Sequence, residues 1–436
     1  TNQPVLQGNR FSEAIEALGI LGIIMAYFFL CDRTTFFMKE NKYYSEFSFW
    51  IPVGWLSAVG LFFTEDSKFT RVLHRDQTDE VKGFMIIVVL IYFMTGASPI
   101  PIYFLSKCFI SAFLFLIGYQ HFSYFWITGN NSISRWMNVM FRLNFMTVIL
   151  CFAMNRPYQF YFFAPLVSFW FSVTYLTFTL PPRITAQSVD NNSYQYLYLV
   201  IKFVCLLSVI TVLYMSEVFF ERIFLMRPWR ALFVSTDDFV DEWWYRFKLD
   251  RYSTAYGMIF SAIAHAAQKF SIFDDSNHGN LFSRRISLSS TLLAIAGIGF
   301  YTTFTFFCKN KQDCEEIHSY VVFIPIISFI ILRNISGVLR TRFSTFFSWF
   351  GKISLELFIC MHHIWLAADR HGVLVLFPGF PTLNIILTST IFVCISHEVH
   401  QITLILVSYA VSENWKLAVR NLILFLILLV KVDQSF

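Results

Sequence analysis

Long apolar segments alternate with short polar segments along the whole chain. A helix needs about 20 apolar residues to cross a bilayer, and on this basis we expect spans near 15–31, 48–64, 84–98, 101–119, 139–155, 157–178, 195–220, 255–270, 287–307, 319–333, 353–367, 383–398, 403–411 and 416–431. The segment 403–411 is short enough to be re-entrant or interfacial. Because backbone groups cannot stay unpaired in lipid, the pattern predicts an all-α, polytopic transmembrane bundle of about 12–14 spans, with 1–436 as a single domain.

Composition supports this class. Of the 436 residues, 56% are hydrophobic and 14% are charged, and the mean hydropathy is +0.57. These values lie outside the range of soluble globular proteins. The net charge of +5 is spread over the loops, which indicates positive-inside topology and predicts lipid, not nucleic acid, as the surrounding partner.

One pair of cysteines differs from the others. Cys308 and Cys314 bracket a polar loop between two predicted spans, whereas most of the other cysteines lie in apolar runs. A disulfide forms in such a loop if the loop is lumenal. Basic residues at 284–285 and 333–342 flank the two spans on the opposite side, which predicts that side to be cytoplasmic. Counting spans backwards also makes 76–82 and the N-terminus cytoplasmic, and 221–254 lumenal.

A charged cluster at 75–82, RDQTDEVK, directly precedes an apolar run. It can be a polar mouth that binds a charged substrate through Arg75 and Lys82. It can also be a solvated turn that caps the helix through Thr78, Glu80 and Lys82. Charge alone favours the capping turn.

Two polar residues interrupt the predicted span 139–155. A charged side chain inside a membrane costs about 3 kcal/mol, so such residues usually face a pathway. We favour that role for Arg142 and Asn144, with a snorkelling arginine as the alternative. Arg156 and Tyr158 follow in a polar turn.

The segment 241–252, DEWWYRFKLDRY, interleaves aromatic and charged residues. This composition is typical first of an interfacial amphipathic segment. It also suits a carbohydrate site, in which Trp244 stacks on a sugar while Arg246 and Asp250 bind hydroxyl groups.

The predicted span 353–367 carries ionisable residues. Glu356 and His363 are seven residues apart and so share a helix face, with Lys352 four residues before Glu356 on that face. A histidine near a carboxylate is what general-base chemistry on a hydroxyl requires. The alternative is a structural hydrogen-bond network between helices. The pattern His397-Glu398-Val399-His400 has the wrong spacing for a zinc motif, and no metal site is predicted.

Several stretches together resemble the multi-spanning domain of the Cas1p family of membrane O-acetyltransferases, and most of all its animal members that act on sialic acid. They are RDQTDEVKGF, GYQHFSYFW, FRLNF, MNRPYQFYFF, DEWWYRFKLDRY and FGKISLELFICMHHIWLAAD. The resemblance implies a multi-pass Golgi protein that moves acetyl groups from cytosolic acetyl-CoA to lumenal glycan hydroxyls. It also implies a lumenal N-terminus after an esterase-like domain that these residues do not include, and another polypeptide can supply that part.

Roles follow from this resemblance. His363, oriented by Glu356, is expected to be the general base or acyl relay. Acetyl-CoA is expected to bind at Arg75, Lys82 and Lys352. The acceptor path is expected to involve Arg142, Asn144, Arg156, Tyr158, Trp244, Arg246 and Asp250.

The chain also departs from the family pattern. The Tyr-His expected in the span 84–98 is Tyr92-Phe93, and the Gln-Tyr-His expected near 361 is Met361-His362-His363. Phe93 cannot move a proton. The alternative function is therefore a catalytically silent homologue that acts as a scaffold or partner subunit. A transporter is less favoured, because no broken-helix pair is visible.

Overall fold

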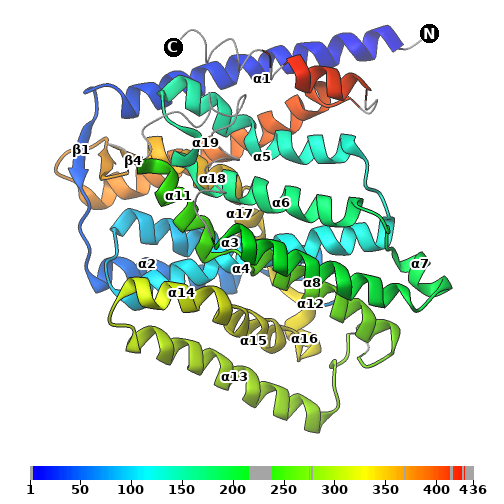
Figure 1. Ribbon diagram of the computed structural model, residues 1–436. Helices are drawn as coiled ribbons and strands as arrows, with labels where there is room; N and C mark the ends of the chain where they lie inside the picture. Colours follow the sequence, from blue (N-terminus) through cyan, green and yellow to red (C-terminus); the bar gives the residue numbers. More distant parts are fainter. Residues whose placement is uncertain are drawn as a thin grey trace.

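The computed structural model describes residues 3–215, 238–273, 275, 278–367, 370–412, 416–424 and 427. Its helices lie side by side, with α1 along one edge and α13 along the other (Figure 1). The helices are α1 (Gln3–Asp32), α2 (Glu46–Phe62), α3 (Arg75–Thr95), α4 (Ile100–Thr128), α5 (Ile133–Met154), α6 (Phe163–Thr179), α7 (Ala186–Asn191), α8 (Gln195–Leu213), α11 (Asp238–Leu249), α12 (Ser253–Lys269), α13 (Arg284–Phe307), α14 (Lys311–Val321), α15 (Phe323–Asn334), α16 (Gly337–Thr341), α17 (Thr345–Lys352), α18 (Ser354–Ile364) and α19 (Pro381–Ala410), with the 3₁₀ helix η1 (Tyr158–Tyr161).

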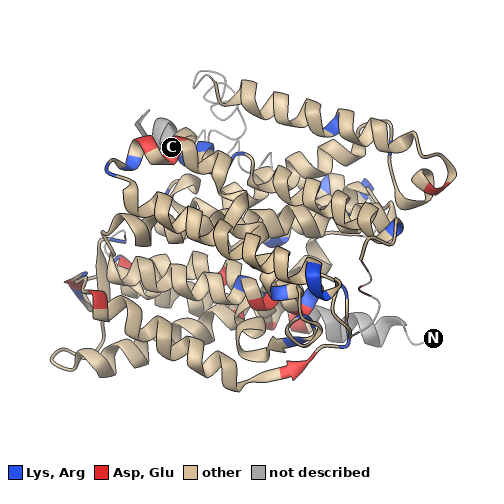
Figure 2. Ribbon diagram, turned by 90° about the horizontal axis from the view of Figure 1, so that it is seen from below, with Lys and Arg blue, Asp and Glu red and all other residues tan. Residues whose placement is uncertain are grey.

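The strands are short and lie at the two ends of the bundle. At one end, β1 (Met38–Asn41), β5 (Gly372–Val375) and β4 (Leu366–Ala367) form an antiparallel sheet in the order β1-β5-β4. At the other end, β2 (Thr64–Asp66) pairs with β3 (Arg342–Ser344) beside α16. We call these the β1 end and the α16 end (Figure 1). Most charged residues gather at the two ends, and the helices between them are largely uncharged (Figure 2).

The predicted transmembrane bundle is confirmed. Among the described helices, six are long and apolar enough to cross a membrane, or seven if the bent pair α14–α15 is one span. That pair bends by 49° at Val322, inside the predicted span 319–333. The predicted break between 398 and 403 is wrong, because α19 continues through it as one helix of 30 residues. Polar residues of this stretch are accommodated inside the protein, where His400 is 7% and Thr403 is 2% exposed.

The charged cluster 75–82 is the start of a helix and not a loop before it. α3 begins at Arg75, and the His74 Nδ1 atom accepts a hydrogen bond from the Gln77 N–H at 3.3 Å. His74 therefore caps the helix, in place of the predicted Thr78, Glu80 and Lys82. Gln77 and Thr78 are fully buried whereas Arg75 is exposed, so the cluster lies only partly in solvent.

Glycines allow two pairs of helices to touch backbone to backbone. A Cβ atom on Gly83 would lie 1.8 Å from the Phe347 carbonyl oxygen, and one on Gly351 would lie 1.8 Å from the Asp79 carbonyl oxygen. α3 and α17 therefore cross at a distance that only glycine permits. Gly118 of α4 and Gly257 of α12 make a second crossing of this kind. Small residues at helix interfaces are a general means of close packing in membranes.

The disulfide predicted between Cys308 and Cys314 is confirmed, with a Cα–Cα distance of 6.1 Å. It lies beside α14, at the β1 end, whereas the start of α1 lies at the opposite end (Figure 1). The disulfide and the first residues of α1 therefore cannot both be lumenal. Disulfides persist in oxidising compartments, so a lumenal disulfide would place the first residues of α1 on the other side, whereas the resemblance implies a lumenal N-terminus.

We predict that Gly83→Ala destabilises the protein by about 3 kcal/mol or more, because overpacking costs about 1–3 kcal/mol even where side chains can shift and here the new methyl group meets backbone. The same change at Gly54 is the control. Gly54 lies within α2 with no atom near its Cβ position, so alanine should stabilise there by about 0.5–1 kcal/mol. Thermal unfolding in detergent measures both, and equal effects at the two sites would contradict the close crossing of α3 and α17.

Candidate active site

The β1-β5-β4 sheet fixes the ends of two helices that meet beneath it. β1 follows α1, and β4 and β5 follow α18, so pairing Met38 with Val375 and Asn41 with Gly372 holds the two connections together. The last residue of α1 is Asp32 and the last turn of α18 contains His362 and His363. The sheet therefore brings together residues that are more than 300 positions apart in the sequence.

Asp32, His363 and Tyr161 form a buried hydrogen-bonded array. The His363 Nδ1 atom lies 2.9 Å from the Asp32 Oδ2 atom, and the His363 Nε2 atom lies 2.6 Å from the Tyr161 hydroxyl. Exposure of the three residues is 7%, 0% and 0% in the order Asp32, His363, Tyr161. A carboxylate on one ring nitrogen orients the imidazole and stabilises its protonated form, which is the arrangement of a general base.

Cationic side chains surround this array. Lys39 donates to the Asp32 carbonyl oxygen at 2.5 Å, and Arg33 lies on the next residue of the chain. The Arg370 and Arg156 guanidinium carbons lie 4.5 and 5.9 Å from the centre of the Phe160 ring. Arg156 and Arg370 thus lie next to η1, on the side of the array formed by Phe160.

Lys42 lies in the connection after β1 and belongs to the same set of charges. Burial lowers the pKa of Lys42 to about 8, and Arg370 nearby acts in the same direction. A bound anion would raise the pKa of Lys42 again, because a nearby negative charge stabilises the protonated lysine.

The predicted pairing of Glu356 with His363 is wrong. The Glu356 Oε1 atom lies 2.9 Å from the His400 Nδ1 atom of α19, and both residues are buried. Asp32 takes the place that was predicted for Glu356. The spacing of seven residues puts Glu356 and His363 two turns apart along α18, and each reaches a different neighbouring helix.

The three residues predicted to bind acetyl-CoA gather at the α16 end. Arg75, Lys82 and Lys352 are the cationic residues whose charges act on Asp79. The Arg75 Nε atom lies 3.9 Å from the Asp79 Oδ2 atom. Lys82 donates to the Gln120 side-chain oxygen. Arg75 and Lys352 are exposed and Lys82 is partly buried, so the set forms a charged patch at the start of α3.

The predicted acceptor path is only partly assembled. The Asn144 amide nitrogen donates to the Ser168 hydroxyl at 2.9 Å, and the Tyr158 hydroxyl donates to the Asn144 amide oxygen. These contacts join α5, η1 and α6, close in sequence to Arg156. Arg142 lies on α5 as well, but it is exposed and does not join them.

The candidate residues of the segment 241–252 do not lie together at one site. Lys248 packs on the Trp244 ring at 5.0 Å, and Arg246 lies 5.5 Å from the Phe162 ring centre. Asp250 accepts a hydrogen bond from the buried Ser111. Asp250 therefore anchors a buried network instead of a substrate path.

The same network continues through a buried histidine. The His318 Nε2 atom lies 3.3 Å from the Ser111 hydroxyl, and its other ring nitrogen lies 3.0 Å from the Tyr301 hydroxyl. Ser111, His318 and Tyr301 come from α4, α14 and α13. The network therefore ties three helices together at the place where Asp250 enters the bundle.

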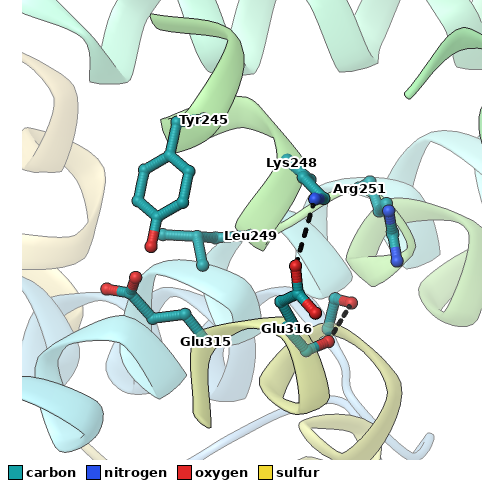
Figure 3. Close-up of a pocket in the computed structure, with 7 residues that line it drawn as sticks. Tyr245, Lys248, Leu249, Arg251, Glu315 and Glu316 are labelled. Atoms are coloured by element: carbon teal, nitrogen blue, oxygen red, sulfur yellow. Dashed lines mark hydrogen bonds and ion pairs between the residues drawn. The ribbon is translucent and has the colours of Figure 1, made fainter. Parts of the chain in front are cut away.

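A shallow hollow lies between α11 and α14 (Figure 3). The Lys248 Nζ atom lies 3.6 Å from the Glu316 Oε1 atom across it. It is lined by Tyr245, Lys248, Leu249, Arg251, Glu315, Glu316 and Ser319. Its charges are therefore largely balanced by one another.

Sequence reasoning missed Asp32, Tyr161 and His400. Asp32 directly follows the first predicted span and looks like a residue that ends it. Tyr161 lies in the stretch MNRPYQFYFF but was not singled out, and His400 belongs to the pattern that lacks zinc-motif spacing. An ionisable residue within or at the edge of a membrane span is itself a sign of function. This criterion could have identified Asp32 from the sequence.

A family model described as the 10 TM acyl transferase domain found in Cas1p matches residues 2–423. The chain belongs to this family, and the resemblance seen in the motifs is confirmed. The chain is also 44% identical over 423 residues to the N-acetylneuraminate (7)9-O-acetyltransferase of Danio rerio, in an alignment that covers 96% of this chain and 54% of that protein. The chain thus spans about half the length of this relative. No solved structure matches the chain.

We predict that Glu356 supports the fold. Removing one partner of a buried pair costs about 3–5 kcal/mol, and replacing both partners by apolar residues is much less harmful. Glu356→Leu should therefore lower the melting temperature strongly, and Glu356→Leu combined with His400→Phe should recover most of the loss. Glu398→Leu, at an exposed position of α19, is the matched control. If Glu356→Gln abolished acetyl transfer without changing stability, Glu356 would regain its predicted catalytic role.

Proposed function

We propose that this chain is the membrane part of an O-acetyltransferase that moves acetyl groups from cytosolic acetyl-CoA to hydroxyl groups of lumenal, sialic acid-type glycans. The observation that carries the proposal is the buried array Asp32–His363–Tyr161 beside a group of cations. Membership of the acyltransferase family and the similarity to a sialic acid O-acetyltransferase support the same reaction.

His363 is the general base of this proposal. Its Nδ1 atom is held by Asp32, so its Nε2 atom accepts the proton of the acceptor hydroxyl, either directly or through the Tyr161 hydroxyl. The hydroxyl oxygen then attacks the thioester carbonyl carbon, the C–S bond breaks, and the thiolate takes the proton from His363. Asp32 stabilises the imidazolium between these two steps.

The cations near Phe160 suit an anionic acceptor. Sialic acid carries a carboxylate, and planar guanidinium groups bind carboxylates through two parallel hydrogen bonds. Arg156 and Arg370, with Lys42 and Arg246 near them, would hold this carboxylate and orient the sugar hydroxyl toward His363.

The donor would enter from the opposite end. Arg75, Lys82 and Lys352 would bind the phosphates of acetyl-CoA at the α16 end. α3 runs from this charged patch toward α18, and position 93 lies about 16 Å along the helix from Lys82. This distance calls for an extended donor, and the pantetheine arm of coenzyme A has that form.

The sidedness of the proposal rests on the disulfide. With the β1 end in the lumen and the α16 end in the cytosol, the donor and the acceptor each reach the site from the compartment that holds them. A Golgi membrane provides both compartments. Lipid surrounds the bundle in this proposal, and a lumenal domain or another polypeptide can present the glycan.

We predict that His363→Gln and Asp32→Asn each lower acetyl transfer by about 10²–10⁴-fold, the usual contribution of general-base catalysis. The measurement is transfer of labelled acetyl from acetyl-CoA to sialylated acceptors in membranes of cells that express the protein and lack endogenous O-acetylation. Asp66→Asn, at an exposed surface pair with Arg342, is the control and should keep full activity. Unchanged transfer by Asp32→Asn would contradict the role of the array.

The silent-homologue alternative is favoured by one observation. The Phe93 ring lies 5.8 Å from the Phe358 ring, which in turn lies 5.7 Å from His362. Position 93 therefore faces the candidate site with an apolar side chain. We predict that the natural chain is active and that Phe93→His changes its rate by less than about tenfold, since His363 already supplies the base. An inactive natural chain that gains transfer with Phe93→His would establish the alternative.

A further inference from the structure

His362 stands apart from the other buried histidines. Five histidines are buried in the described part of the chain: His74, His318, His362, His363 and His400. Four of them have at least one ring nitrogen within hydrogen-bond distance of a partner. His362 is fully buried, and neither of its ring nitrogens has a hydrogen-bond partner. Because buried polar groups are nearly always paired, an exception in a candidate site points to a ligand.

Three aromatic rings pack around His362. Phe160, Tyr161 and Phe358 lie 5.3, 5.7 and 5.7 Å from its ring centre. Phe160 and Tyr161 also contact the His363 ring, at 5.9 and 5.6 Å. The two histidines therefore share the same aromatic neighbours, and a group bound beside these rings would meet both.

The charges near the two histidines are opposite in sign. His363 is bonded to the Asp32 carboxylate, which stabilises a protonated ring. Among the described residues, the charged groups that act on His362 besides His363 are Arg370, Lys42 and Arg246, all cationic. A neutral imidazole has one N–H donor and one acceptor nitrogen, and the cations near the His362 ring favour any negative charge that develops beside it.

We propose that His362 is the oxyanion-binding catalytic residue of the acetyl transfer, and that its neutral N–H donates to the carbonyl oxygen of the acetyl thioester. This inference rests on the proposed function. As the hydroxyl oxygen bonds to the carbonyl carbon, the carbonyl electron pair moves to that oxygen, where His362 and the nearby cations stabilise it. When the pair returns, the C–S bond breaks and the thiolate takes its proton from His363. His362 gains and loses no proton.

Two variants at this position test the proposal. His362→Phe removes the donor and should lower kcat for transfer by about 10²–10³-fold, the usual effect of losing one oxyanion donor. The KM for acetyl-CoA should change little. His362→Gln keeps an N–H donor but cannot carry a proton, and it should remain within about tenfold of the natural protein. The assay is labelled acetyl transfer from acetyl-CoA to sialylated acceptors in the same membranes as for the His363 and Asp32 variants.

Thermal stability supplies a readout that does not depend on activity. Because His362→Phe removes an unpaired buried polar group, its melting temperature should equal or exceed that of the natural protein. His397→Phe is the matched control: its Nδ1 atom also lacks a partner, but its ring packs on Trp349, in the short helix α17. This control should keep full transfer.

The outcomes separate the two proposals. A natural protein that transfers no acetyl contradicts the proposed function and this inference with it. An active natural protein whose His362→Phe variant keeps full activity contradicts the inference alone. If Gln is as inactive as Phe, His362 carries a proton and the oxyanion role is wrong. A melting temperature lowered by Phe would assign His362 to a structural contact with a bound water and overturn the inference.

Discussion

The contact between Asp32 and His363 is the interaction on which the candidate site depends. A carboxylate taken out of water costs several kcal/mol unless an opposite charge or good hydrogen bonds compensate for it. Asp32 is 7% exposed, and its Oδ2 atom lies 2.9 Å from the His363 ring. This one bond joins the end of α1 to the end of α18, and the β1-β5 pairing next to it keeps the two chain segments in register.

The same constraint explains how polar groups are distributed in the rest of the bundle. Other buried acidic groups also find partners on a different helix: Glu356 pairs with His400, and Asp250 with Ser111. The partly buried Glu80 accepts from Arg333 at 2.6 Å. These polar pairs fix the positions of helices relative to one another, because hydrogen bonds are directional and apolar packing is not. Among the described buried histidines His362 is the exception, and this is why its position argues for chemistry and not for packing.

The sequence predicted the class of fold well, because hydropathy reports directly on which segments can lie in lipid. It also predicted the Cys308–Cys314 bond. It could not predict the partner of His363, since helix spacing tells which residues share a face but not which helix lies opposite. Glu356 was chosen because it is near in sequence, whereas Asp32 is near only in space. The continuous α19 was missed for a related reason: burial of its polar residues, such as His400, depends on neighbouring helices that the sequence does not show.

The proposed reaction uses the two ends of the bundle for two substrates from opposite sides of a membrane. The α16 end has a charged patch at the start of α3, and the β1 end holds the array and its cations. In the proposed reaction, the acetyl group travels along α3 and is received at α18.

Binding of acetyl-CoA to the purified, detergent-solubilised protein, measured by calorimetry, tests the proposed donor route most directly. The route predicts saturable binding in the micromolar range that weakens when Lys82 is replaced by Met, because the charged patch at the start of α3 would lose one of its cations. No heat of binding at millimolar acetyl-CoA would contradict it, and the bundle would then retain the fold of an acyltransferase without its donor site.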